Sequence, residues 1–130
     1  MSNFASKILD YMEFQFEKLA VWQQAKELVK IVYKLVAKFP QEERYALCDQ
    51  LRRAIVSVPS NIAEGSGRTH QNDKIHFLEI AYGSLMEAYC QLSVAFELGY
   101  ITEDDFKPLK PLFYTEAKML SGLRKSYEAQ

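Results

Sequence analysis

Residues 78–95, LEIAYGSLMEAYCQLSVA, decide the fold of this 130-residue chain. The apolar residues of this stretch recur every three or four positions, at Leu78, Ala81, Leu85, Ala88, Leu92 and Ala95. Because an α-helix repeats every 3.6 residues, these side chains share one face of a helix. The stretch therefore predicts a helix that is buried along one side. Gly99 lies just past the end of this helix and is expected to terminate it, because glycine adopts the left-handed backbone conformation at little energetic cost.

Two segments before this stretch show the same period. In the first, the expected inner seam comprises Trp22, Ala25, Val29, Val32, Val36 and Phe39, with Leu28 and Leu35 widening it. Pro40 ends this helix because proline cannot donate a backbone hydrogen bond and restrains the residue before it. The second helix is predicted to begin near Gln41, and its seam comprises Leu47, Leu51, Ala54 and Val58.

A proline interrupts the second helix within residues 52–68, RRAIVSVPSNIAEGSGR. Pro59 lacks a backbone donor and its ring presses on the carbonyl of Ile55, so we expect the helix to bend there. The helix is then predicted to end around Glu64 and Gly65, and a polar link over residues 65–72 leads to the third helix.

The last segment opens at Thr102, where a hydroxyl cap is followed by three acidic residues, a strong signal for a helix start. Its inner face comprises Phe106, Leu109, Phe113, Ala117, Leu120 and Leu123. Pro108 falls in the early turns, where its missing donor costs little, whereas Pro111 is expected to bend the helix.

Four amphipathic helices with short links predict an all-α fold, an up-down-up-down antiparallel four-helix bundle over residues 16–130. No segment shows the alternating pattern of a strand. Residues 1–15 lie outside the helical pattern and are expected to form an N-terminal arm.

Composition narrows the class of protein. The net charge of −1 provides no overall cationic field, so any nucleic-acid binding must use a local basic patch. No apolar run approaches the length of a membrane span and no basic-then-apolar leader is present, so we expect a cytoplasmic protein. Cys48 and Cys90 are far apart, without metal-ligand spacing, and are expected to be buried free thiols.

Lysines recur at multiples of four along the first predicted helix. They are Lys18, Lys26, Lys30, Lys34 and Lys38, with Glu27 the one acid inside that segment. Residues four apart share a helix face, so these ammonium groups form a slowly winding cationic stripe that could match the phosphates of a nucleic acid. The alternative is a solvated outer face without a partner, which is the usual role of such charges.

Three arginines add to the candidate nucleic-acid surface. Arg52 and Arg53 point about a quarter-turn apart and cannot both face the core, so one is expected to pair with a carboxylate while the other reaches an interface or a phosphate. The carboxylate pairing predicts a structural polar network of Arg52, Asn61, Glu64 and Glu87. Arg68 follows the glycine stop and is the freer phosphate candidate.

The sequence favours no catalytic site and no cofactor. Asp73, His76 and Glu79 lie three apart on one helix, but di-iron sites in bundles need Glu-x-x-His on two helices and further glutamates. We therefore expect no functional metal. Neither cysteine has a recognisable base with an orienting partner, so we do not expect an enzyme.

Apolar residues beside the predicted seams favour self-association. Tyr45, Ile55, Tyr82 and Met86 add apolar area that a monomer would expose. Tyr89 and Tyr114 are further candidates for a subunit interface, where a phenol tolerates partial burial.

Three stretches carry a family resemblance: LAVWQQAKELV, FPQEERYALCDQLRRAIVSVPSNIAEGSGR and FLEIAYGSLMEAYCQL. They resemble the bacterial four-helix bundle family of 23S rRNA intervening sequences, which includes the accessory variability determinant of diversity-generating retroelements. The similarity spans about residues 16–127 and is most specific from Gln50 to Arg68. His70, Lys74, His76 and Tyr89 depart from the family pattern, so the surface at the start of the third helix is expected to differ.

The resemblance implies a cytosolic bundle that assembles as a homopentamer and associates with nucleic acid in some members. It implies no enzymatic activity, and for most members the role is unknown. Our leading hypothesis is therefore a non-catalytic oligomer that binds RNA or DNA, as an accessory to a nucleoprotein enzyme such as a reverse transcriptase. The alternative is a structural or protein-interaction scaffold with no nucleic-acid role.

Overall fold

The computed structural model describes residues 13–130, and all regular structure in this range is helical. The four long helices are α2 (Ala20–Val36), α3 (Leu47–Ser66), α4 (Gln71–Glu97) and α6 (Leu109–Glu128). The short elements are η1 (Gln15–Lys18), η2 (Gln41–Glu43) and α5 (Glu103–Phe106). The all-α prediction is therefore confirmed. Most of the predicted N-terminal arm, residues 1–12, lies outside the described residues.

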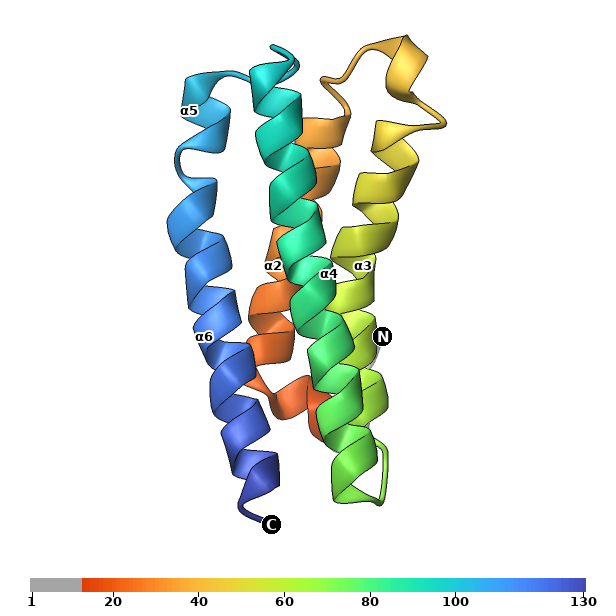
Figure 1. The fold of residues 1–130 in the computed structure, drawn as a ribbon, viewed down its shortest axis with the longest axis vertical. Helices are drawn as coiled ribbons and strands as arrows, with labels where there is room; N and C mark the ends of the chain where they lie inside the picture. The colour runs from red at the N-terminus through yellow and green to blue at the C-terminus, as the bar shows by residue number, and fades with distance from the viewer. Residues whose placement is uncertain (1–12) are drawn as a thin grey trace, which may run out of the picture.

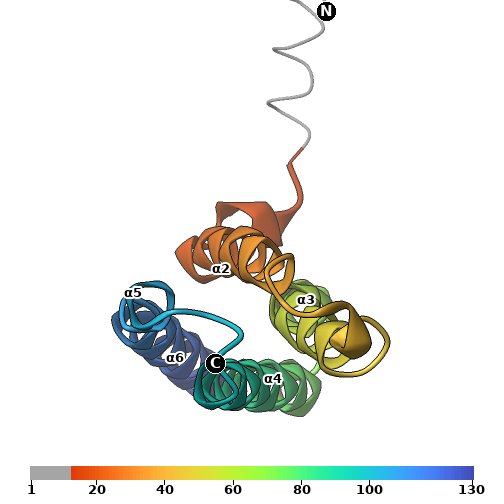
Figure 2. The same cartoon turned by 90° about the horizontal axis from the view of Figure 1, so that it is seen from above.

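The long helices lie side by side around a common axis. Figure 1 shows α2 and α4 running in one direction, and α3 and α6 running in the other. Seen from the end in Figure 2, α4 lies between α3 and α6. The α3–α4 contact is the most extensive, whereas α6 packs mainly on α4 and less on α2. None of the helices within residues 13–130 has a stretch long and apolar enough to cross a membrane.

The predicted seam of α4 forms the centre of the core. All six of its residues are at most 2% exposed. The α3 residues Leu51, Ala54 and Val58 are buried beside them. Ile55 is also fully buried, so the prediction that it forms exposed apolar area at an interface is wrong.

The predicted seam of α2 is partly wrong. Trp22 and Val29 are only half-buried, and Val21, which was not predicted, is buried. The other predicted residues are in the core: Ala25, Leu28, Val32, Leu35, Val36 and Phe39. The buried face is thus centred on positions 21, 25, 28, 32, 35 and 39 rather than on 22, 25, 29, 32, 36 and 39. Both sets step by three and four residues, so the period alone cannot distinguish them. Trp22 packs against η1, where its ring meets the ring of Phe16 edge-on with centroids 4.9 Å apart.

Two helix starts differ from the prediction. α3 begins at Leu47 rather than near Gln41, because residues 41–43 form the separate turn η2. The hydroxyl of Thr102 accepts a hydrogen bond from the backbone N–H of Asp105, as the cap signal predicts, but the helix stops after Phe106. Pro108 then precedes α6, and Pro111 is the third residue of α6, where an N–H would have no partner inside the helix.

α3 continues through Pro59 as one helix, and the bend there stays a prediction. Beside the proline, the Asn61 side-chain amide donates to the backbone oxygen of Ser57 at 2.8 Å. The hydroxyls of Ser57 and Ser84 lie 2.8 Å apart and join α3 to α4. The predicted role of Gly99 is confirmed, because its φ of +79° is in the left-handed region.

Gly65 is a contact point between helices and does not end α3. The helix runs on to Ser66, and the link to α4 is only residues 67–70. Gly65 is buried, and a Cβ placed there would lie 3.1 Å from the backbone oxygen of Lys74 and 3.1 Å from the Cβ of Phe77. The missing side chain therefore lets α4 approach the end of α3 closely.

This close approach predicts opposite effects at two glycines. Gly65→Val should lower the free energy of unfolding by roughly 1–3 kcal/mol, because a branched side chain must force the helices apart. Gly83→Ala should raise it by about 0.5–1 kcal/mol, because a Cβ there meets nothing within 4 Å and alanine favours a helix. Urea denaturation measures both, and equal effects at the two positions would refute the assignment.

Candidate nucleic-acid interface

The predicted lysine stripe runs from η1 along α2 to Lys38, two residues past the end of α2, and is largely exposed. Two of its five ammonium groups already pair with carboxylates: Lys30 with Glu27 at 3.1 Å, and Lys38 with Asp105 at 2.8 Å. The Lys38 contact and the hydrogen bonds from Thr102 hold the pKa of Asp105 below its ordinary value. The positive charge of this surface is therefore partly neutralised.

Lys26 is occupied in another way, because its ammonium lies 4.0 Å from the centroid of the Trp22 ring. Such a cation–π contact leaves the charge in place but holds it against the protein. Lys18 and Lys34 are exposed and make no ion pair with any residue between 13 and 130. Two cations of the stripe therefore remain without a partner among the described residues, Lys18 in its first half and Lys34 in its second half.

The three predicted arginines do not converge on one site. Arg52 pairs with Asp49 at 3.2 Å, and Arg68 pairs with Glu64 one helical turn away. The Arg68 guanidinium also lies 4.8 Å from the centroid of the Phe77 ring, so this side chain is less free than predicted. Arg53 is exposed beside a polar groove between α3 and α4.

The predicted network of Arg52, Asn61, Glu64 and Glu87 is not formed within the described chain. Asn61 bonds to Ser57, and Glu87 accepts a hydrogen bond from the Gln91 side chain at 3.2 Å. Gln91 also lies 3.3 Å from the side-chain oxygen of Gln50. The helices α3 and α4 are therefore joined by neutral amides and hydroxyls, while Arg52 pairs with Asp49 on α3 itself.

A second basic surface, which the sequence analysis missed, runs along α6. We call it the α6 face: Lys107, Lys110, Lys118, Arg124 and Lys125. The four lysines pair with no carboxylate among residues 13–130, and Arg124 alone is bonded, to Glu79 and Glu128 at 2.9 Å each. Glu116 is the one acid between residues 107 and 127, and it is fully buried. No exposed carboxylate of α6 before Glu128 therefore opposes these charges.

Burial of Glu116 is what makes the α6 face purely cationic. Its side chain is 0% exposed, and neither carboxyl oxygen has a hydrogen-bond partner within the described residues. Burial raises the pKa of this carboxyl to about 8, because the charged form is poorly solvated in an apolar core. The sequence gives a signal for this placement: Glu116 shares the helical phase of Leu109, Phe113 and Leu120.

A groove between α4 and α6 borders the α6 face. It has a volume of about 600 Å³, and α4 contributes Tyr82, Met86 and Tyr89 to it. From α6 come Phe113 and Ala117 at the floor and Tyr114 and three lysines at the edge. Tyr114 is 62% exposed, and the ammonium of Lys118 lies 5.1 Å from the centroid of its ring. The groove thus combines aromatic rings with unpaired cations.

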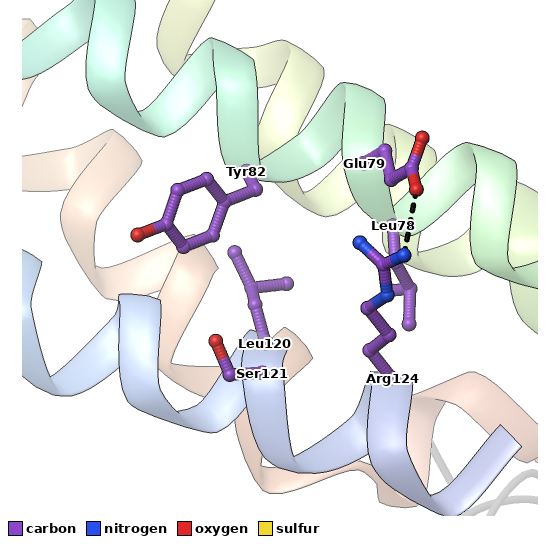
Figure 3. Close-up of a pocket in the computed structure, with 6 residues that line it drawn as sticks. All are labelled: Leu78, Glu79, Tyr82, Leu120, Ser121 and Arg124. Atoms are coloured by element: carbon purple, nitrogen blue, oxygen red, sulfur yellow. Dashed lines mark ion pairs between the residues drawn. The ribbon is translucent and has the colours of Figure 1, made fainter. Parts of the chain in front are cut away.

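An ion pair lies at one end of the groove. Figure 3 shows the adjoining hollow, in which Arg124 of α6 reaches Glu79 of α4. The Nη2–Oε1 distance of this pair is 2.9 Å. Tyr82 and Ser121 line both hollows, so the two are continuous along the α4–α6 boundary. The pair ties the two helices together there, while the lysines farther along have no such partner.

The candidate metal and thiol groups are separate from this groove. Within residues 13–130 no three histidine, cysteine or acidic side chains are grouped so as to hold a metal ion, and Glu79 is engaged by Arg124. Cys48 is buried as predicted, and burial raises the pKa of its thiol. Cys90 is exposed, so the prediction for it is wrong. Its place on α4, two residues after Ala88, turns it out of the core.

Comparison with known proteins agrees with the helical architecture. The family model described as 23S rRNA-intervening sequence protein matches residues 17–122. A solved structure from Bacteroides thetaiotaomicron, a protein of unknown function from the S23 ribosomal protein family, is similar with a TM-score of 0.74. The two chains are 21% identical over 82% of this chain and 99% of that one, a likeness that shows the fold. No protein with a curated description matches the chain.

Proposed function

The chain belongs to the 23S rRNA-intervening sequence protein family, and from this premise we propose that it is a non-catalytic, self-associating helical bundle that binds RNA. The α6 face is the observation that carries the proposal. Four of its five cations have no carboxylate partner among the described residues, and the surface carries no exposed acid of its own before Glu128. Phosphates are the ligands that such a surface attracts, and RNA carries one on every nucleotide.

The α6 face fits this role better than the stripe on α2. Lys30 and Lys38 of the stripe are already paired, so a phosphate must compete there with Glu27 and Asp105. On α6 the lysines Lys110 and Lys118 have no such competitor, and they border exposed aromatic rings. Basic side chains interleaved with aromatic ones are typical of nucleic-acid surfaces.

Filter binding to a structured RNA across a salt series tests the proposal. We expect measurable affinity near 50 mM salt that falls steeply by about 200 mM, because each phosphate contact releases a counterion. Matched DNA of the same sequence shows whether the 2′-hydroxyl contributes. Binding that is absent at low salt would leave the alternative, a protein-interaction scaffold, as the better account.

The α2 stripe provides a separate prediction. Lys26→Glu, Lys30→Glu and Lys34→Glu combined should weaken RNA binding less than tenfold, roughly the effect of a long-range change in charge. Lys30 and Lys26 are engaged by Glu27 and Trp22, so their loss removes few contacts to RNA. Abolished binding in this variant, with the helical content of the wild type, would place the site on α2.

We also propose that the protein self-associates, as a ring of five by family resemblance, and acts in the cytoplasm with RNA or with a nucleoprotein enzyme. Exposed apolar side chains support assembly: Val56 of α3, Ile80 and Val94 of α4, and Leu98 just after α4 are 37–55% exposed. Tyr82 and Met86 line the groove beside α6 instead. Light scattering of the purified chain should give a mass above that of one copy, and a stable monomer at micromolar concentration would contradict self-association.

A further inference from the structure

The α4–α6 groove offers a ligand flat aromatic rings in addition to positive charge, because tyrosine side chains are exposed at its edge. Tyr114 is 62% exposed and Tyr82 and Met86 are 41% exposed, although all three border an apolar floor. Tyr89 anchors that floor, with its ring centroid 5.7 Å from that of Phe106 and 5.5 Å from that of Phe113. The floor is therefore packed ring against ring, while the rings at the edge are exposed to solvent, with the Lys118 ammonium over the Tyr114 ring.

The cations lie along the same groove. Lys110 and Lys125 are fifteen residues apart on α6, which corresponds to roughly 22 Å at 1.5 Å per residue. Lys118 lies between them beside Tyr114. A chain of phosphates following α6 could therefore meet three ammonium groups in succession while its other groups face the tyrosines.

We infer that this groove binds an unpaired, single-stranded segment of RNA, with bases stacked on Tyr114 and Tyr82 and phosphates at Lys110, Lys118 and Lys125. The inference rests on the proposed function and adds the class of RNA to it. In a duplex the bases are stacked inside and their faces cannot reach a side chain, so the tyrosine rings would have no partner. Unpaired bases present those faces, and stacking on aromatic side chains tolerates any base sequence.

The chemistry of the groove favours bases over an acidic protein helix. An amphipathic helix binds with its apolar face in a groove that is hydrophobic along its length. Four aromatic residues and three lysines are among the residues that line the hollow between α4 and α6. This lining contains no leucine, isoleucine or valine, and its edge exposes tyrosine rings beside lysines.

Fluorescence anisotropy with two labelled RNAs tests the inference: an unstructured single strand of about 12 nucleotides, and a duplex of the same length. The single strand should bind at least about fivefold more tightly at equal salt. Tyr82→Ser combined with Tyr114→Ser should weaken its binding at least tenfold, because stacking of each base is lost. Duplex affinity should not change.

Matched variants separate loss of stacking from loss of structure. Tyr82→Phe with Tyr114→Phe keeps both rings and should bind the single strand as the wild type does. Tyr45→Ser removes a ring that is 81% exposed outside the groove and should have no effect. The serine variants should also keep the salt dependence of the wild type, because no phosphate contact is removed. Circular dichroism confirms that each variant retains its helices.

The outcomes distinguish failure of this inference from failure of the proposed function. Equal binding of both RNAs, with serine variants that match the wild type and lysine variants that bind weakly, overturns the inference and leaves the function intact. Binding of neither RNA overturns both. An acidic amphipathic peptide that binds to the groove while neither RNA does would assign it to a protein partner.

Discussion

Replacing Glu116 with glutamine should raise the free energy of unfolding by about 4 kcal/mol above pH 8, where the wild type must bury a charge. The carboxyl is fully buried without a hydrogen-bond partner among residues 13–130, and burial raises its pKa from 4.5 to about 8. Glutamine keeps the shape of the side chain but cannot ionise. The gain is therefore the cost of the charge rather than of packing.

The pH dependence of this effect has a defined sign. Between pH 4.5 and about 8 the folded chain holds a proton on Glu116 that the unfolded chain has lost, so stability falls as pH rises. Below this window both states are protonated, and above it both are ionised, so the contribution is constant in each range. Urea denaturation from about pH 4 to 9 should therefore show a wild-type curve and a Glu116→Gln curve that diverge as pH increases.

An exposed acid provides the control for Glu116. Glu97→Gln, at the end of α4, should change stability by less than about 0.5 kcal/mol at any of these pH values. Parallel pH profiles for the wild type and Glu116→Gln would mean that the Glu116 carboxylate is solvated or paired in solution. That result would also contradict our explanation of the α6 face, in which burial of Glu116 leaves only cations exposed on that helix before Glu128.

Charge reversal on α6 should have the largest effect on binding. Lys110→Glu, Lys118→Glu and Lys125→Glu combined should weaken binding of structured RNA by roughly 100-fold or more near 100 mM salt. Three phosphate contacts are lost and three repulsive charges are added on a surface whose nearest acids, Glu79 and Glu128, are already paired with Arg124. All three side chains are exposed, so the helical content and the unfolding transition should be retained.

The α2 triple variant is a matched control for this reversal, because it changes the net charge by the same amount. A larger loss in the α2 variant than in the α6 variant would reverse our assignment of the surface. Equal losses would indicate that RNA responds only to the overall charge of the molecule and contacts neither helix specifically.

The sequence correctly predicted those parts of the fold in which the spacing of apolar residues is compatible with only one buried face. The six α4 seam residues are all in the core because no neighbouring register of that helix is equally apolar. The start signal at Thr102 and the positive φ at Gly99 were likewise predictable, since each depends on a local hydrogen bond or backbone angle. Local chemistry of this kind does not need tertiary contacts to be recognised.

Other features were decided by packing and could not be read from spacing. α2 has two apolar registers, and the contact of Trp22 with Phe16 accompanies the choice of the one through Leu28. Gly65 looked like a helix stop because its contact with Lys74 and Phe77 is visible only once α4 is in place. The break between α5 and α6 was not predicted, because Pro108 by itself fits the early turns of one continuous helix.

In the candidate site, too, the positions of residues along a helix were predictable from the sequence, whereas their tertiary contacts were not. Lysines at multiples of four predicted a stripe on α2, but the spacing could not show that Asp105, distant in sequence, pairs with Lys38. The α6 face was not predicted, because only the burial of Glu116 shows that no exposed carboxylate lies among these lysines on α6. Placing that carboxyl in the core by its helical phase would have revealed the unopposed cations.

The most direct test of our central claim, that the lysines of α6 contact RNA phosphates, is the slope of log affinity against log salt. We would compare wild type with the combined Lys110→Gln, Lys118→Gln and Lys125→Gln variant, which removes charge without adding repulsion. Our account predicts a slope that is shallower by about 2, since each lost phosphate contact removes about 0.7. An identical slope in both proteins would show that these lysines do not contact the RNA backbone.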